Sequence, residues 1–548
     1  MTDRNRDGDH DKRGLTRSDL LKRAAALVPA VALARYEDAI AQIARASAVG
    51  SSNDLRGMNV VLFITDQNRA IQNFPRGWSK KNLPGLERLK RNGLEFQNAF
   101  TNACMCSPAR STMATGFFPA QTGVRYTLEE DMPADQYPQV ETPIDFANFA
   151  SVMMAAGYNV SWKGKWHLSK PAGELWAPND VAEYGYAHWN PQDAGANQDP
   201  PQAGGGTYNN DGRYMNQKGP VRKGQQGVLQ YVDSQAAKEQ PFFLVVSLVN
   251  PHDVLMYPKS LTEAGYGDEW LVGDVQLPVT VNEDLSTKPK VQAEFLKLFG
   301  AASGFLKDDQ EKLNYINFYA NLMKSSDRHL VNLLNRLERN KLLDNTLVIA
   351  TADHGEMGVA HGGLRQKNFN FYEESIKVPL VYSNPKLFPR PKRTKALVSH
   401  VDFLPTLASL FKAPKAARTN WQGVDYSKKV LKPSSKAPQD YIVFTYDDFQ
   451  SGQARGPYLP PPNHIVSVRE ARWKLAEYFD IEGKVASEWE MYDLKTDPKE
   501  TTNLAWPGYT RTAAQEKQFQ RLQKKLARIK RTRLKPLPNT PVPQTAPT

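Results

Sequence analysis

The chain contains the run Cys106-Ser107-Pro108-Ala109-Arg110-Ser111-Thr112-Met113-Ala114-Thr115-Gly116, in which a cysteine precedes a proline by two positions and an arginine by four. Pro108 lacks an N–H and has a fixed φ, so it suits the first turn of a helix. Cys106 then lies where free N–H groups and the helix dipole favour an anion, and Arg110 can donate paired hydrogen bonds to the same point. The run predicts a nucleophile at the start of a helix, although a lone cysteine is more often a small buried apolar residue.

Two further runs are apolar and end in acids, residues 59–67 (NVVLFITDQ) and 347–356 (LVIATADHGE). This pattern is typical of strands buried on both faces, and open α/β sheets bind ligands at the carboxyl ends of such strands. Asp66 and Asp353 would together form an oxygen-rich site for a hard divalent cation. A single strand that ends in Asp more often precedes an ordinary helix cap, so the argument depends on the pair.

The cysteine run resembles the signature of the type I sulfatases, in which Cys-x-Pro-x-Arg precedes a small-residue helix and the cysteine is converted to formylglycine. Other segments resemble the same family in the same order. Gly157–His167 is similar to its Gly-Lys-Trp-His element, and Pro241–Asp253 is a buried strand that ends in histidine. Lys367 matches the second active-site lysine, and Met491–Leu504 is similar to the closing motif of the C-terminal subdomain. The resemblance extends over residues 59–505.

The resemblance implies an alkaline-phosphatase-like α/β fold. It has a large mixed sheet sandwiched by helices and a smaller C-terminal α+β subdomain built on a short antiparallel sheet. We expect a signal-like segment at 1–45, a catalytic domain at 56–435, the C-terminal subdomain at 436–512, and a basic helix with a Pro-rich tail at 513–548. The 548 residues, of which 40% are hydrophobic, suffice for one large core and a smaller satellite.

The resemblance also implies the residues of the site. It implies metal ligands at Asp66, Gln67, Cys106, Asp353 and His354, and catalytic roles for Cys106, Arg110, Lys165, His167, His252 and Lys367. Gln67 and His354 depart from the Asp-Asp and Asp-Asn pairs of the better-known calcium sulfatases. They look like the branch that contains choline sulfatases and phosphonate monoester hydrolases. We therefore expect one divalent metal, Ca²⁺, with Mn²⁺ as the alternative.

The implied reaction is hydrolysis of a small-molecule or carbohydrate sulfate ester to an alcohol and inorganic sulfate. An oxygen of the hydrated formylglycine attacks sulfur, Lys165 and Lys367 stabilise the sulfuryl charge, and His252 or Lys367 protonates the leaving alcohol. The other hydroxyl, deprotonated with help from His167, then expels sulfate. Maturation of Cys106 requires a formylglycine-generating enzyme as a partner.

Two alternatives to a sulfatase stay open. The first is a phosphonate or phosphate ester hydrolase that uses the same formylglycine and metal. The second is a non-catalytic sulfoglycan-binding protein, in which Cys106 remains a thiol. The relative turnover of an aryl sulfate and a phosphodiester separates the first alternative from a sulfatase, and the chemical state of Cys106 separates the second.

The net charge and the cysteine content limit which other classes of protein fit the sequence. The net charge of +12 would suit a nucleic-acid partner, but no helix-turn-helix, RNA-recognition or zinc-finger pattern occurs, so we expect none. A positive surface would also attract anionic substrates such as sulfated carbohydrates. Cys104 and Cys106 are too close along the chain for an ordinary structural disulfide, which excludes a disulfide framework.

The amino terminus carries an export-like pattern. Thr16–Arg23 precedes the short apolar stretch Ala24–Ala34, as in a secretory signal, and we expect no transmembrane span after it. The pattern resembles a twin-arginine signal, but Ser18 stands where the second arginine belongs. We expect a periplasmic or secreted protein, and a cytoplasmic one where the degenerate signal does not function.

Two more segments carry expectations. The segment from Glu183 to Gly227 is rich in Gly, Asn, Gln and Pro, and we expect a long surface excursion that selects substrate. Near the carboxyl end, apolar residues at 519, 522, 526 and 529 recur at helical spacing between basic residues, which predicts a terminal helix docked by one apolar stripe. Contact of this helix with anionic lipid or polysaccharide is the alternative. We expect the tail from Pro536 to be disordered.

Overall fold

The described part of the chain begins after its export-like segment. The computed structural model describes residues 54–541, apart from 71–72, 130–138, 196–199, 201–202, 207–208, 236–237 and 452–455. The predicted signal-like segment at 1–45 and the last residues of the Pro-rich tail lie outside the described residues. None of the helices in the described ranges is long and apolar enough to cross a membrane.

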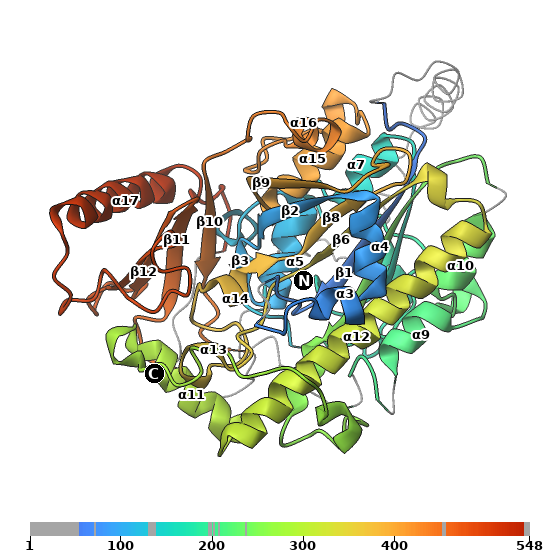
Figure 1. Ribbon diagram of the computed structural model, residues 1–548. Helices are drawn as coiled ribbons and strands as arrows, with labels where there is room; N and C mark the ends of the chain where they lie inside the picture. Colours follow the sequence, from blue (N-terminus) through green and yellow to red (C-terminus); the bar gives the residue numbers. More distant parts are fainter. Residues whose placement is uncertain are drawn as a thin grey trace, which may run out of the picture. The chain divides into compact units, whose positions relative to one another are not determined.

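A mixed sheet forms the centre of this part of the chain (Figure 1). Its strands are β1 (Asn59–Asp66), β2 (Gly93–Phe100), β4 (Asn159–Gly164), β5 (Phe242–Pro251), β6 (Thr346–Ala352), β7 (Lys377–Val378), β8 (Leu380–Ser383) and β9 (Lys392–Ser399). They follow the order β4-β5-β1-β6-β8-β2-β7, and β9 pairs with β2. Strands β4, β5, β1 and β6 are parallel, so their carboxyl ends meet at one edge of the sheet.

Side-chain alternation along β1 explains why helices cover both faces of this sheet. Val60, Leu62 and Ile64 enter one hydrophobic core, whereas Val61 and Phe63 enter another on the opposite face. The first core is covered by α5 (Cys106–Thr115), α7 (Phe149–Ala155) and α15 (Phe403–Leu410), and the second by α4 (Pro84–Arg91), α10 (Val228–Gln235) and α12 (Asp309–Arg339). The predicted fold class, a large mixed sheet between helices with a second, smaller sheet, is confirmed.

The remaining helices are shorter or lie outside these two layers. They are α3 (Trp78–Asn82), α6 (Pro119–Thr122), α8 (Pro178–Ala182), α9 (Asn210–Asn216), α11 (Lys290–Ser303), α13 (Ala360–Gly363), α14 (Glu373–Ile376), α16 (Ser427–Leu431) and α17 (Ala513–Arg531).

The smaller sheet contains a strand from the first quarter of the chain. Its strands are β10 (Tyr441–Tyr446), β11 (His464–Glu470), β12 (Trp473–Phe479), β13 (Glu488–Asp493) and β3 (Ala103–Cys104). The four C-terminal strands are antiparallel, as expected, but β3 adds to β10 in parallel. Asn102 strengthens this junction, because its Nδ2 donates to the Val443 carbonyl (2.7 Å) and its Oδ1 accepts from the Val401 N–H (2.8 Å). The strand that leads into the cysteine run is therefore held by the C-terminal sheet.

The segment from Glu183 to Gly227 is only in part the surface excursion that its composition predicts. In its described part, Trp189 and Tyr214 are fully buried. Four of its described polar residues are buried as well, and one of them, Asp211, accepts hydrogen bonds from the backbone N–H groups of Val249 and Asn250 at the end of β5. Part of the polarity of the segment therefore serves hydrogen bonds to buried backbone, while residues such as Lys218 and Arg222 are exposed to solvent.

Helix α17 docks on the C-terminal sheet through the apolar stripe that its spacing predicts. Leu522, Leu526 and Ile529 are buried in one core with Val466 and Leu475 of β11 and β12. Beside this stripe, Lys525 of the helix forms an ion pair with Glu470 at 2.7 Å. The helix therefore belongs to the packed structure, and the limits of the predicted parts at 436–512 and 513–548 stay predictions.

We expect Leu526→Ala to lower the free energy of unfolding by about 2–5 kcal/mol, because it leaves a cavity between α17 and the sheet. Lys524→Ala, at an exposed position on the same helix, serves as the control and should change it by less than about 0.5 kcal/mol. Urea denaturation followed by circular dichroism measures both variants. Equal midpoints for Leu526→Ala and the wild type would show that α17 does not contribute to the core.

Candidate active site

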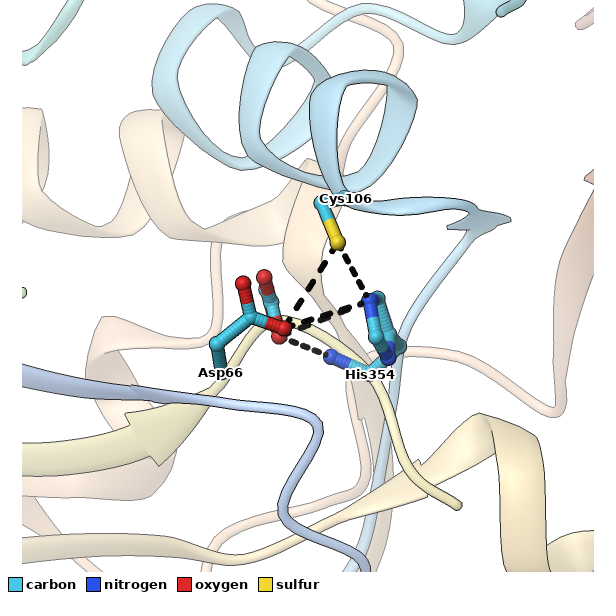
Figure 2. Close-up of side chains that lie close together, drawn as sticks. Asp66, Cys106 and His354 are labelled. Carbon is cyan, nitrogen blue, oxygen red and sulfur yellow. Dashed lines mark hydrogen bonds and ion pairs between the residues drawn. The ribbon is translucent and has the colours of Figure 1, made fainter. Parts of the chain in front are cut away.

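The cysteine begins helix α5 at the edge where the parallel strands end. Met105 precedes the helix, Cys106 is its first residue and Pro108 its third, so the predicted helix start is confirmed. All ten residues of α5 are buried. The Cys106 side chain extends from the helix start toward Asp66 and His354 (Figure 2). Its Sγ lies 3.1 Å from His354 Nε2 and 3.6 Å from Asp66 Oδ1.

Four of the predicted metal ligands form one buried group. Potential ligand atoms of Asp66, Cys106, Asp353 and His354 lie within 4.8 Å of one another. They meet because β1 and β6 are adjacent parallel strands, in register up to Thr65 and Ala352, so the residues that follow lie side by side.

The donor set of this group fits a divalent cation. His354 Nδ1 lies 3.1 Å from the Gly355 carbonyl, which can only accept, so the imidazole proton is on Nδ1. The lone pair on Nε2 is then free to bind a metal. Two carboxylates and one imidazole nitrogen are a donor set that divalent metals use in proteins.

Two cations offset the charge of the two buried carboxylates. Arg110 donates from Nε to Asp353 Oδ2 (3.0 Å) and from Nη2 to Asp66 Oδ2 (3.4 Å). Lys165 Nζ lies 2.5 Å from Asp66 Oδ2. Burial alone would raise the pKa of Asp66, but the cations Lys165 and Arg110 hold it well below the usual range. Asp66 is therefore ionised at neutral pH, as a metal ligand must be.

Gln67 connects the metal group to Lys367. It adopts a left-handed backbone conformation (φ 66°), and its Oε1 accepts a hydrogen bond from Lys367 Nζ at 2.7 Å. Its Nε2 donates to Glu356 Oε2 at 2.5 Å. The structure thus shows Gln67 holding Lys367, and its role as a metal ligand stays a prediction.

A small pocket opens above the cysteine. Cys106, His167, His252 and Lys367 all line it. Arg110 and Lys165 lie deeper, against Asp66, and Arg110 also donates to Ser247 Oγ at 2.8 Å. The structure brings together every site residue that the sequence predicts, in two layers: the charged metal group below and the pocket wall above.

A family profile for the sulfatases matches residues 58–413 of this chain, more than half of its length. The chain belongs to the sulfatase family. A second profile, for the C-terminal region of N-sulphoglucosamine sulphohydrolase, matches residues 361–532. The suspected resemblance is therefore confirmed, and the family consists of hydrolases that act on sulfate esters.

Individual members of the sulfatase family resemble the chain over most of its length. It is 24% identical over 506 residues to an N-acetylglucosamine-6-O-sulfatase of Bacteroides thetaiotaomicron, covering 81% of this chain and 82% of that protein. It is also 24% identical over 466 residues to a choline-sulfatase of Rhizobium meliloti, covering 82% of each. Among solved structures, the phosphonate monoester hydrolase of Agrobacterium radiobacter shares the fold, with a TM-score of 0.62, 19% identity, and coverage of 87% of this chain and 96% of that one.

The two pocket histidines of this sulfatase family member are held neutral. His167 Nε2 lies 2.6 Å from the Leu128 carbonyl, so the proton is on Nε2, and Nδ1 has no hydrogen-bond partner among the described residues. Burial and the charge of Lys165 lower the pKa of His167 well below its usual value, and the same causes act on His252. His167 Nδ1 is therefore a proton acceptor in the pocket.

The pKa of the Cys106 thiol is raised, whereas its position at the start of a helix alone would lower it. Burial and the nearby Asp66 carboxylate raise its pKa to about 12, despite the helix dipole. An unmodified Cys106 is a neutral thiol at neutral pH and a poor nucleophile.

Several residues that shape the site carry no recognisable signal in the sequence. Asp193 accepts hydrogen bonds from the backbone N–H groups of Trp166 and His167, each at 2.7 Å. The Gly195 carbonyl accepts from Lys165 Nζ at 2.5 Å. Both residues lie in the irregular segment after Glu183, where neither periodicity nor a motif distinguishes a positioning residue from a loop residue.

We expect Asp193→Asn to destabilise the protein by about 1–3 kcal/mol, because an amide nitrogen would face one of the two backbone N–H groups and leave it buried without an acceptor. Asp344→Asn, an exposed aspartate, is the matched control and should leave stability within about 0.5 kcal/mol. Thermal and urea unfolding measure the difference. Wild-type stability in Asp193→Asn would show that the carboxylate does not hold this turn.

Proposed function

We propose that the protein hydrolyses organic sulfate esters to an alcohol and inorganic sulfate, using formylglycine made from Cys106 and one divalent metal. The observation that carries this proposal is the position of Cys106. It contacts Asp66 and His354 of the metal group on one side and lines the pocket with His167, His252 and Lys367 on the other. A group at this junction would touch both a bound metal and a substrate.

The proposed metal site consists of Asp66, Asp353, His354 and the residue at position 106, with Gln67 as a further ligand. When bound, the ion supplies a Lewis acid that polarises oxygens at this position. Calcium is the first expectation because two carboxylates dominate the site, and the imidazole of His354 supports manganese as the alternative. Formylglycine, once hydrated, supplies a nucleophilic hydroxyl and a second hydroxyl whose deprotonation releases sulfate.

The residues of this chain supply charge and proton transfer. Arg110 and Lys165 balance the carboxylates below the pocket, and Lys367 brings a cation to the pocket wall for the sulfuryl oxygens. The free Nδ1 of His167 takes the proton that sulfate release requires. The leaving alcohol receives its proton from His252 or Lys367, which line the same pocket, and the neutral state of His252 favours Lys367 as the donor. Low exposure of these groups strengthens each interaction.

Two further elements belong to the proposal. Maturation requires a formylglycine-generating enzyme, because the thiol itself is a weak nucleophile here. The substrate is a small-molecule or carbohydrate sulfate ester, as the names of the relatives suggest. Export to the periplasm or exterior, and the cytoplasmic alternative, depend on a segment outside the described residues and stay predictions.

Two residues of the site favour a second candidate activity, hydrolysis of phosphonate esters. Gln67 and His354 depart from the pattern of the better-known calcium sulfatases, and the fold is shared with a phosphonate monoester hydrolase. The ratio of kcat/KM for an aryl sulfate to that for a phenyl phosphonate monoester decides between the two. A higher value for the phosphonate would make phosphonate hydrolysis the main activity.

We expect the peptide that contains Cys106, from protein produced with a formylglycine-generating enzyme, to have the mass of an aldehyde in place of the thiol. Cys106→Ala should lower sulfate ester turnover by about 10³-fold or more, because the nucleophile is lost. Cys104→Ala is the matched control: this buried cysteine is two residues away and should leave both the aldehyde and turnover in place. A persistent thiol at position 106 would overturn the formylglycine mechanism and favour the binding-protein alternative.

We expect one tightly bound divalent metal per chain, and its loss in Asp353→Ala, because this substitution removes a carboxylate ligand. Elemental analysis of the purified proteins measures metal content, with Asp344→Ala as a control that should keep the metal. Reloading stripped protein with Ca²⁺ or Mn²⁺ and measuring turnover identifies the working ion. Full metal content in Asp353→Ala would show that the ion binds elsewhere.

A further inference from the structure

Glu129 is a carboxyl group of the pocket that the proposed chemistry does not use. It lines the same pocket as Cys106, and only 7% of the residue is exposed. Its backbone N–H donates to Gln139 Oε1 at 2.9 Å. Within the described ranges, however, no hydrogen-bond donor or cation contacts its side-chain carboxyl. A largely buried carboxyl that lines a pocket and has no side-chain partner among these residues can bind a hydrogen-bond donor on a ligand there.

The backbone on either side of this carboxyl is held firmly. Thr127 N–H donates to Asp448 Oδ2 at 2.9 Å, and Leu128 N–H donates to Ser107 Oγ at 3.1 Å. The Leu128 carbonyl in turn accepts from His167 Nε2. Three hydrogen bonds, two of them to α5 and to a pocket histidine, thus fix the position of Glu129 relative to the reacting centre.

The surroundings of Glu129 decide which chemistry fits it. The cations Arg110 and Lys165 are already paired with the buried carboxylate of Asp66. Burial and the nearby Asp448 raise the pKa of Glu129 well above its usual value. The other walls of the pocket include Leu255, Phe295 and Phe299, whose side chains cannot donate a hydrogen bond. The pocket therefore combines apolar contact surface with polar side chains, among them Thr127, Asn368 and Ser451, and Glu129 is a carboxyl of this wall that the proposed chemistry does not use.

We propose that Glu129 is a specificity-determining residue, which binds a hydrogen-bond donor, a hydroxyl or an ammonium group, on the alcohol part of the sulfate ester. This assignment rests on the proposed function. It predicts that the enzyme distinguishes alcohols by a polar group remote from the ester oxygen. A site built to hydrogen-bond such a group rejects the analogue without it much more strongly than an apolar pocket rejects a shape change.

The test uses full-length protein, loaded with metal and bearing the aldehyde at position 106. Its substrates are phenyl sulfates that carry an aminomethyl, hydroxymethyl or ethyl group at the meta or para position. These groups have similar size, and only the first two donate hydrogen bonds. The readout is the ratio of kcat/KM for each donor-bearing ester to that for its ethyl counterpart, so a general loss of activity leaves the ratio unchanged.

For the wild type we expect a ratio of about tenfold or more for at least one donor at one ring position. Glu129→Met keeps the length of the side chain, removes both oxygens, and should abolish the preference for both donors. Glu129→Gln keeps an accepting oxygen but cannot ionise beside a bound ammonium, so it should abolish the preference for the ammonium but retain part of that for the hydroxyl. The stronger of the two wild-type ratios identifies an amine or a polyol as the natural alcohol.

Glu174→Gln, the same substitution at an exposed glutamate, is the control and should keep the wild-type ratios. Ratios near one in the wild type, or a preference that survives in Glu129→Met, would overturn the assignment while leaving sulfate ester hydrolysis intact. Failure of the wild type to hydrolyse any of the esters, the ethyl ones included, would instead overturn the proposed function and this assignment with it.

Discussion

The carboxylate of Asp66 is the constraint on which the site depends. It is completely buried and close to Lys165, Arg110, His354 and Cys106. A buried charge is tolerated only with partners in good geometry. Lys165 follows β4 and Arg110 lies on α5, while His354 follows β6. The charge balance around the two oxygens of this carboxylate therefore requires three separate elements to meet at the end of β1, which is also where the proposed metal site and Cys106 lie.

The central strands and the site could be predicted because their signals are local. An apolar run that ends in Asp specifies both a buried strand and the edge where its acid lies, and parallel pairing then brings Asp66 and Asp353 together. Pro108 specifies the start of a helix regardless of what surrounds it. The other site residues could be predicted from the order of the motifs, because that order resembles the sulfatase family, whose profile matches residues 58–413.

What the sequence could not provide is information about burial and long-range pairing. The sequence after Glu183 predicts a polar loop, yet Asp193 and Asp211 accept hydrogen bonds from buried backbone N–H groups. The helix start suggests an anionic Cys106, yet burial and Asp66 raise its pKa. Both outcomes depend on which residues surround a group in three dimensions, a quantity that spacing along the chain does not encode. Glu129 likewise has no motif, and only the pocket distinguishes it from a surface acid.

The pairing of β3 with β10 also has a consequence for the order of events during synthesis. Asn102 and its partner Val443 are 341 positions apart, so the strand leading into Cys106 has no sheet to join until nearly the whole chain has been made. At the usual pace of translation this interval lasts on the order of tens of seconds. In the folded protein Cys106 is only 1% exposed. The late closure of the small sheet thus leaves a period in which the thiol is accessible on the nascent chain, before folding encloses it.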